Sequence, residues 1–245
     1  MTERNLENES DEALLEVIRE GSAEDLALLI NYLTDEGKGR ISLSNDRCKR
    51  MVTARDRGKY SPVIHTIIYD EIRAFGGNTF MNLFNPSKGA SYLSILRDVL
   101  KQLRVSYESN EDHLGLEQKL SLKLLSQVCE SMSEKQLREL MEAVNPSGGL
   151  NDLGSLFKAI SGSRTLYLAL LEMLTVSVSP YLIARPVLGL VPLAFPVGAV
   201  LGTVLTTYGL ARPAYRVTLP CTMHIAYMRQ KKAAQNTFST STTTE

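Results

Sequence analysis

The sequence predicts an all-α fold, a multi-helix bundle with a C-terminal glycine-rich apolar helical hairpin. Apolar residues recur at the i, i+3, i+4 spacing of a buried helix face through most of residues 1–163. No run of alternating β-branched residues between turns, which would mark a strand, occurs in that part. The third observation is an uncharged, glycine-containing run over residues 186–211, which predicts the hairpin.

The helical stripes of the first part follow one another closely along the chain. Each stripe is wide enough to need a partner helix, and so many stripes can supply those partners within one bundle. Their apolar residues are Leu14, Val17 and Ile18; Leu26, Leu29, Ile30 and Leu33; Ile64, Ile67, Ile68, Ile72 and Phe75; Tyr92, Ile95, Leu96, Val99, Leu100 and Leu103; Leu116, Leu120, Leu124, Leu125 and Val128; Leu137, Leu140, Met141 and Val144; Leu150, Leu153, Leu156, Phe157 and Ile160.

Several stripes carry start and stop signals. Ser22, with an acid three residues later, resembles a capping box and predicts a helix start. Ser61 followed by Pro62 predicts another start, because proline suits the first turn of a helix. Gly76 and Gly77 predict the end of that helix, since glycine readily adopts the left-handed conformation of a C-cap.

The composition is that of a globular chain. Of its 245 residues, 44% are hydrophobic and 22% are charged, and 27 Lys and Arg balance 27 Asp and Glu. This balance argues against a chain that is basic throughout, so no nucleic-acid partner is expected. Cys48, Cys129 and Cys221 lie far apart without a CxxC motif, which argues against a disulfide framework and fits a reducing compartment.

The zero net charge conceals a division of the chain. Residues 1–163 hold 20 Lys and Arg against 25 Asp and Glu, whereas residues 164–245 hold 7 against 2. The chain is therefore acidic first and basic last. We predict an N-terminal helical segment at 1–36, an amphipathic helical domain at 37–163, an apolar glycine-rich helical region at 164–232 and a disordered tail at 233–245.

Charge is also uneven within the first part. Residues 1–36 carry 11 acids and two bases, and residues 37–60 carry eight bases and two acids. This pattern favours two solvated surfaces that attract each other. A phosphate or nucleic-acid patch at 37–60 is the alternative, and it lacks the interleaved aromatic residues that single-strand binding prefers.

The uncharged run at 186–211 leaves two hypotheses open. As a helix it would extend about 39 Å, enough to cross the hydrocarbon core of a bilayer, and Gly198 and Gly202 form a GxxxG spacing that permits close helix contact in lipid. Pro192 and Pro196 lie inside the run and would kink such a helix. The segment therefore either inserts into or associates with a membrane, or forms a hairpin buried against the first part.

Motifs for catalysis are absent from the sequence. It contains no P-loop, GxGxxG, HExxH or GxSxG motif, and the three histidines are scattered. Cys221 and His224 are three residues apart and could face one another on a helix, which suggests a nucleophile with its base. Their apolar neighbours favour a buried structural pair instead. We therefore predict no enzyme, no cofactor and no metal site.

Two stretches are more specific than helix formation requires. One covers residues 68–84, followed by Tyr92 and residues 95–99. The other covers residues 213–220, followed by residues 225–226 and 228–229. Together they resemble the bacterial YaaW-like family, an uncharacterised group. The helical domain of that family is classified with the ubiquinol–cytochrome c chaperone domain and is preceded by a short N-terminal domain of unknown function. The candidate partner-binding residues in these stretches are Phe75, Gly76, Gly77, Asn78, Phe80, Tyr215, Arg216 and Pro220.

The resemblance implies a helical, non-enzymatic protein-interaction module of chaperone or assembly-factor type. Its expected partner is an unidentified protein client, bound in an apolar groove between helices of residues 62–160. Its expected location is the cytoplasm or the inner face of a membrane, and its oligomeric state is left open. Physically, residues 75–78 look like a helix end at a tight reversal, with Phe80 and Phe84 folding back into the core.

Overall fold

The computed structural model describes residues 2–40, 43–80, 89–144, 148–149, 152–178 and 215–241. Within these ranges the chain forms helices and no strand, which confirms the predicted all-α fold. The helices are α1 (Glu3–Glu20), α2 (Ala23–Thr34), α3 (Asn45–Arg57), α4 (Pro62–Phe80), α5 (Tyr92–Gln102), α6 (His113–Glu130), α7 (Glu134–Val144), α8 (Leu153–Gly162), α9 (Arg164–Val178) and α11 (Tyr215–Ser241).

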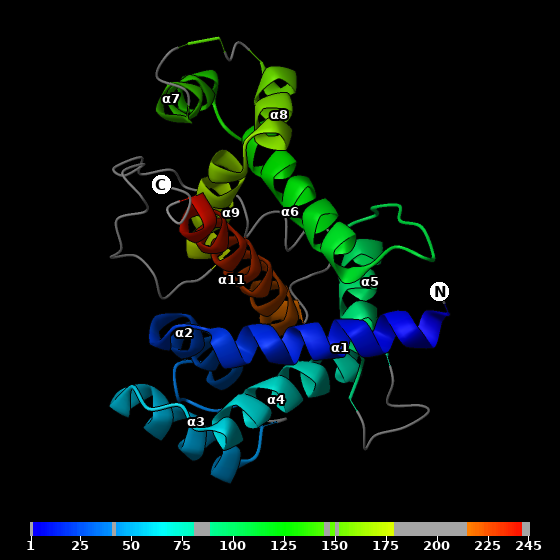
Figure 1. Ribbon diagram of the computed structural model, residues 1–245, viewed down its shortest axis with the longest axis vertical. Coiled ribbons are helices and arrows are strands. Elements are labelled where there is room, and N and C mark those ends of the chain that lie inside the picture. The colour runs from blue at the N-terminus through cyan, green and yellow to red at the C-terminus, as the bar shows by residue number, and fades with distance from the viewer. Residues whose placement is uncertain are drawn as a thin grey trace.

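Helix α11 lies in the middle of the bundle, although it is last in the chain (Figure 1). It packs against α1, α2, α4, α5, α6 and α9, while α7 and α8 lie at one end of the molecule. One continuous apolar core joins side chains from α1 through α9 with those of α11. The core therefore extends across the predicted boundary at residue 163, and the four-segment division stays a prediction.

The sequence of α11 explains its central position. From Val217 to Ala226 every residue is buried, so this half of the helix presents no solvent-facing side. A helix that is apolar all round is stable in water only when other helices surround it. Its second half carries Arg229, Lys231 and Lys232, and these bases face carboxylates of α1, α2 and α6.

The predicted helix starts are confirmed, and one predicted end is wrong. Ser22 caps α2 in a capping box, and α4 begins at Pro62. Helix α4 does not stop at Gly76 and Gly77 but continues to Phe80. A Cβ atom on Gly76 would lie 2.3 Å from Ile95 Cγ1, so this glycine permits close contact between α4 and α5.

Helix α3 is not among the helices predicted from the sequence, because it has few apolar residues among many charged ones. Ser44 caps its start by accepting a hydrogen bond from the backbone N–H of Arg47 (3.3 Å). Only Cys48, Met51 and Ala54 are buried along its length, at successive intervals of three residues. These three side chains form a narrow stripe that fixes α3 to α2 and α4.

The run at 186–211, with Gly198 and Gly202, lies outside the described residues. Among the helices that the structure describes, none combines the length and the apolar character needed to cross a bilayer. Helix α11 extends through Ser241 and so includes much of the segment 233–245 that the sequence predicts to be a disordered tail.

Candidate functional site: a polar groove between α1, α4 and α5

A groove of about 790 Å³ opens between the first half of α1, the end of α4 and the start of α5, and we call it the α1–α4–α5 groove. Most of its lining residues are of polar type, and they include charged residues of both signs. The lining residues are Glu3, Arg4, Glu7, Asn8, Asp11, Arg73, Gly76, Gly89, Ala90, Ser91, Ser94, Arg97, Asp98, Lys101, Tyr107 and Ser109.

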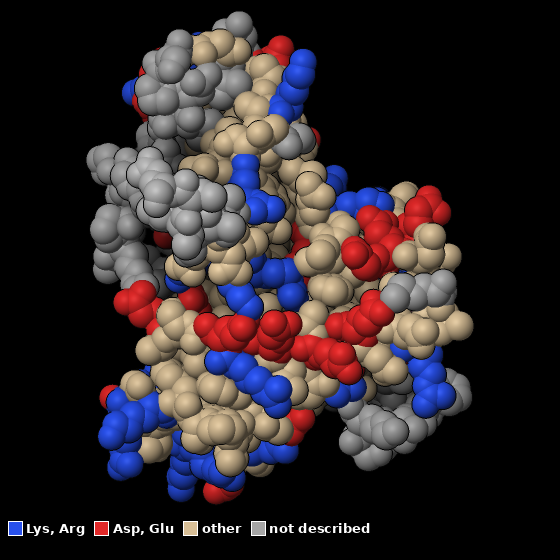
Figure 2. All heavy atoms as spheres, viewed as in Figure 1, with Lys and Arg blue, Asp and Glu red and all other residues tan. Residues whose placement is uncertain are grey.

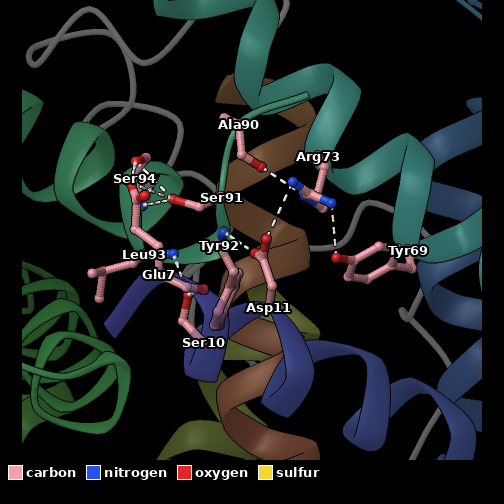
Figure 3. Close-up of polar contacts among 10 residues, drawn as sticks. All are labelled: Glu7, Ser10, Asp11, Tyr69, Arg73, Ala90, Ser91, Tyr92, Leu93 and Ser94. Carbon is pink, nitrogen blue, oxygen red and sulfur yellow. Dashed lines mark hydrogen bonds and ion pairs between the residues drawn. The ribbon is translucent and has the colours of Figure 1, made fainter. Parts of the chain in front are cut away.

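Arg73 is the centre of one wall of the groove (Figure 3). Its guanidinium forms an ion pair with Asp11, with Nη2 3.1 Å from Oδ2. It also donates hydrogen bonds to the carbonyl of Ala90 (3.0 Å) and to the hydroxyl of Tyr69 (2.8 Å). Because these partners come from α1, α4 and the residue before the α5 cap, Arg73 holds three parts of the wall together.

The start of α5 is capped by side chains of α1, about 80 residues earlier in the chain. Asp11 Oδ1 accepts a hydrogen bond from the backbone N–H of Tyr92 (2.7 Å), and Ser10 Oγ accepts one from that of Leu93 (3.1 Å). Ser91 supplies the ordinary N-cap and accepts from the N–H of Ser94 (3.2 Å). The first backbone N–H groups of a helix have no partner within the helix. In α5 those of Tyr92, Leu93 and Ser94 all donate to side chains.

Burial sets the electrostatics of this wall. It raises the pKa of the Asp11 carboxyl above its ordinary value, although the Tyr92 N–H and the Arg73 charge both favour the ionised form. Glu7 Oε1 accepts hydrogen bonds from Ser91 and Ser94, each 3.2 Å long. These acids are thus committed to internal partners at the base of the groove.

Of the predicted residues, Gly76 lines the groove, and Tyr215 contacts a residue of α5 that lines it. Gly76 lines the groove, next to the buried Phe75. Tyr215, at the start of α11, is buried and donates a hydrogen bond from its hydroxyl to Asp98 Oδ2 (2.9 Å). Because Asp98 also lines the groove, the two motif stretches lie together here.

Of the other predicted residues, Arg216 and Pro220 do not line the groove. Arg216 is exposed on α11, and Pro220 is buried inside that helix. Gly77, Asn78 and Phe80 belong to the last turn of α4, and their side chains lie outside the described residues.

Sequence reasoning missed the polar residues that build the site. Arg73 and Asp98 fall inside the motif stretches, so a search of those stretches for charges could have found them. No sequence signal marks Asp11 or Ser10, because the partners of these two residues on α5 are more than 80 residues away.

Cys221 and His224 are both buried, and burial shifts the pKa of each side chain. Burial raises the pKa of the Cys221 thiol to about 12 and lowers the pKa of His224 to about 4. His224 Nε2 lies 3.1 Å from the carbonyl oxygen of Asp25, and its ring stacks on Tyr227. At neutral pH the thiol is therefore protonated, which disfavours a nucleophile here.

The expected apolar groove differs from the polar one that the structure contains. The described apolar residues of the stripes between residues 62 and 160 are buried in the core or pack against it. Val63 and Leu114 are the exposed large apolar side chains of the described part of the chain. Within that part, no group of three or more His, Cys, Asp or Glu side chains is placed to hold a metal ion.

Comparison with known proteins relates the chain to a group of bacterial proteins. It is 32% identical over 193 residues to a UPF0174 protein of Helicobacter pylori strain 26695, covering 69% of this chain and 88% of the relative. It is 28% identical over 242 residues to the UPF0174 protein YaaW of Escherichia coli K12, covering 94% and 98%. No family model and no solved structure matches the chain.

Proposed function

From the premise that the chain belongs to the UPF0174 family, we propose that it is a non-enzymatic interaction module of chaperone or assembly-factor type that binds a polypeptide client in the α1–α4–α5 groove. The observation that carries this proposal is that the first motif stretch lines the groove and the second contacts its wall. Gly76 comes from the first stretch, and Tyr215 of the second reaches Asp98 at the groove wall.

The shape and the lining of the groove favour a polypeptide over a small apolar ligand. Small-molecule sites are mostly apolar and enclose their ligand, whereas this groove is open, and serines, acids and bases line much of it. Alternating charges and hydroxyl groups suit the backbone and mixed side chains of a peptide.

Much of the polar lining is held rigidly before any client binds. Arg73, Asp11 and the α5 cap form a connected network in which each member has an internal partner. A preorganised surface lowers the entropic cost of association, because fewer side chains must be ordered on binding.

Photo-crosslinking tests the proposal in cells of the native host. A benzoyl-phenylalanine at Asn8, an exposed lining residue of α1, is expected to yield discrete and reproducible adducts. The same probe at Lys135 of α7, whose side chain is 81% exposed, serves as the control and should not yield them.

A second variant ties the adducts to the groove. Ser109→Trp adds bulk at an exposed lining position and should abolish crosslinking from Asn8 while circular dichroism stays unchanged. Equal adducts from Asn8 and Lys135, or adducts that survive Ser109→Trp, would show that the groove is not the client site.

A further inference from the structure

The corner where α3 meets α4 carries a basic surface that the groove does not use. Residues 45–60 include six bases and two acids, and Figure 2 shows Lys and Arg gathered over α3, below the acidic band along α1. We propose that this α3–α4 corner is a docking surface for the anionic headgroups of a lipid bilayer.

Three bases of this corner, Lys49, Arg57 and Lys59, are directed to solvent. Lys49, Thr53 and Arg57 follow at intervals of four residues, which places them on one face of α3, and all three are exposed. Lys59 is exposed in the turn that follows. In the described structure Lys49, Arg57 and Lys59 form no ion pair or hydrogen bond through their side chains, so their charges are available to a partner.

Neighbouring acids neutralise part of the surface and leave the charges of Lys49, Arg57 and Lys59. Arg47 pairs with Glu71 (2.6 Å) and with Asp70 (3.5 Å) of α4. Arg55 pairs with Asp56 (2.9 Å), which removes that acid from the balance. Asp46 is 4.0 Å from Arg50, at the limit of an ion pair. Arg19, at the end of α1, lies close enough to His65 to contribute to the lowering of its pKa. The positive surface therefore continues from α3 around the start of α4.

An exposed apolar side chain distinguishes a bilayer from a nucleic acid as the partner. Val63 lies in the first turn of α4 and is 51% exposed, beside the basic turn. Basic residues with an adjacent apolar side chain are typical of surfaces that rest at the headgroup level, where the apolar group is removed from water. Surfaces for single-stranded nucleic acid instead present exposed aromatic rings for stacking, and the only aromatic residue of the turn, Tyr60, packs against the core.

The corner and the α1–α4–α5 groove can be occupied together. Asp11 of α1 faces Arg73 of α4, and Arg19 of α1 is near His65 of α4, so the two helices run antiparallel. The groove lies toward one end of this pair and the corner at the other, and the stretch from Asp11 to Arg19 separates them by about 12 Å along the helix axis. A bilayer at the corner would leave the groove open to a client.

Vesicle flotation of the full-length chain tests the proposal. Vesicles with 30% phosphatidylglycerol should bind the chain, pure phosphatidylcholine vesicles should bind it far more weakly, and 0.5 M salt should release it because it screens surface charge. The triple variant Lys49→Gln, Arg57→Gln, Lys59→Gln should bind about 100-fold more weakly, from about fivefold for each base. Val63→Ser should weaken binding about threefold.

A matched control isolates the corner from net charge. Lys135→Gln, Arg138→Gln, Lys158→Gln removes the same charge from exposed positions of α7 and α8 and should bind like the wild type. An equal loss of vesicle binding in both triple variants, or binding that does not depend on phosphatidylglycerol, would show that the corner is not the docking surface. If the chain binds duplex DNA more tightly than the anionic vesicles, and the first triple variant loses that binding, the surface is a nucleic-acid site instead.

Discussion

Arg229 of α11 and Glu117 of α6 form an ion pair inside the bundle, with Nε 3.2 Å from Oε2. The Glu117 side chain is 4% exposed and also accepts a hydrogen bond from the Tyr92 hydroxyl (2.8 Å). Burial raises the pKa of Glu117, and the Arg229 charge opposes that effect. The pair joins α6 and α11 to the first residue of α5.

Removing one partner of this pair should cost more than removing both charges. Arg229→Met leaves a carboxylate buried without its counter-charge and should lower the free energy of unfolding by about 3 kcal/mol. Adding Glu117→Gln keeps an acceptor for Tyr92 and should restore about 2 kcal/mol of that loss. Urea unfolding of both variants measures the difference. Lys232→Gln, which removes an exposed pair with Glu20, should cost under about 1 kcal/mol.

The cap that α1 supplies to α5 should be measurable as stability. Asp11→Ala removes the acceptor of the Tyr92 N–H and the counter-charge of Arg73, so we expect a loss of about 2 kcal/mol in the free energy of unfolding. Glu12→Ala changes an exposed neighbour and should stay within about 0.5 kcal/mol. Equal losses in thermal denaturation of the two variants would show that the cap contributes nothing.

Gly76 should tolerate alanine only when its neighbour is reduced. Gly76→Ala places a Cβ 2.3 Å from Ile95 Cγ1 and should destabilise the fold by about 1–3 kcal/mol. In an Ile95→Ala background the same change should cost much less, because the clashing atoms are gone. Gly162→Ala meets open space on α8 and should be neutral or slightly stabilising in the same unfolding assay. A cost for Gly76→Ala that is unchanged by Ile95→Ala would contradict this packing.

His224 predicts a loss of stability in mild acid. Its pKa is about 4 in the fold, against 6.5 in an unfolded chain, because burial disfavours the charged ring. Between these values the unfolded state binds more protons, so stability falls as the pH falls. From pH 7 to pH 5 this amounts to about 2 kcal/mol.

Unfolding of a His224→Asn variant at pH 7 and at pH 5 tests the assignment. The difference between the two pH values should be smaller than in the wild type by about 2 kcal/mol. His113, whose pKa is also lowered to about 4 by burial, keeps its own contribution in both proteins. An unchanged difference would mean that His224 titrates normally.

The sequence predicts the charge division of the chain but not all of the ion pairs that the charges form. The acidic start and the basic end are visible in the sequence, but the acids of residues 1–36 were expected to attract the bases of residues 37–60. In the described part of the chain the structure contains two such pairs, Glu36 with Lys38 and Asp35 with Arg40. It also pairs Asp25 with Lys231 (3.1 Å) and Glu16 with Lys232 (3.6 Å), which the local pattern did not predict. Each of these last two contacts spans about 200 residues, and a pattern of local charge carries no information on such a distance.

The sequence by itself determined the helical class, most of the helices and several of their starts, because apolar spacing and caps act within a few residues. Only the tertiary structure decided that α11 occupies the centre, that Gly76 serves close packing and that Asp11 caps α5. These features depend on which helix faces meet, and many combinations of amphipathic helices satisfy the same local pattern. Packing of complete side chains selects one combination, and that selection placed the polar groove where the motif stretches meet.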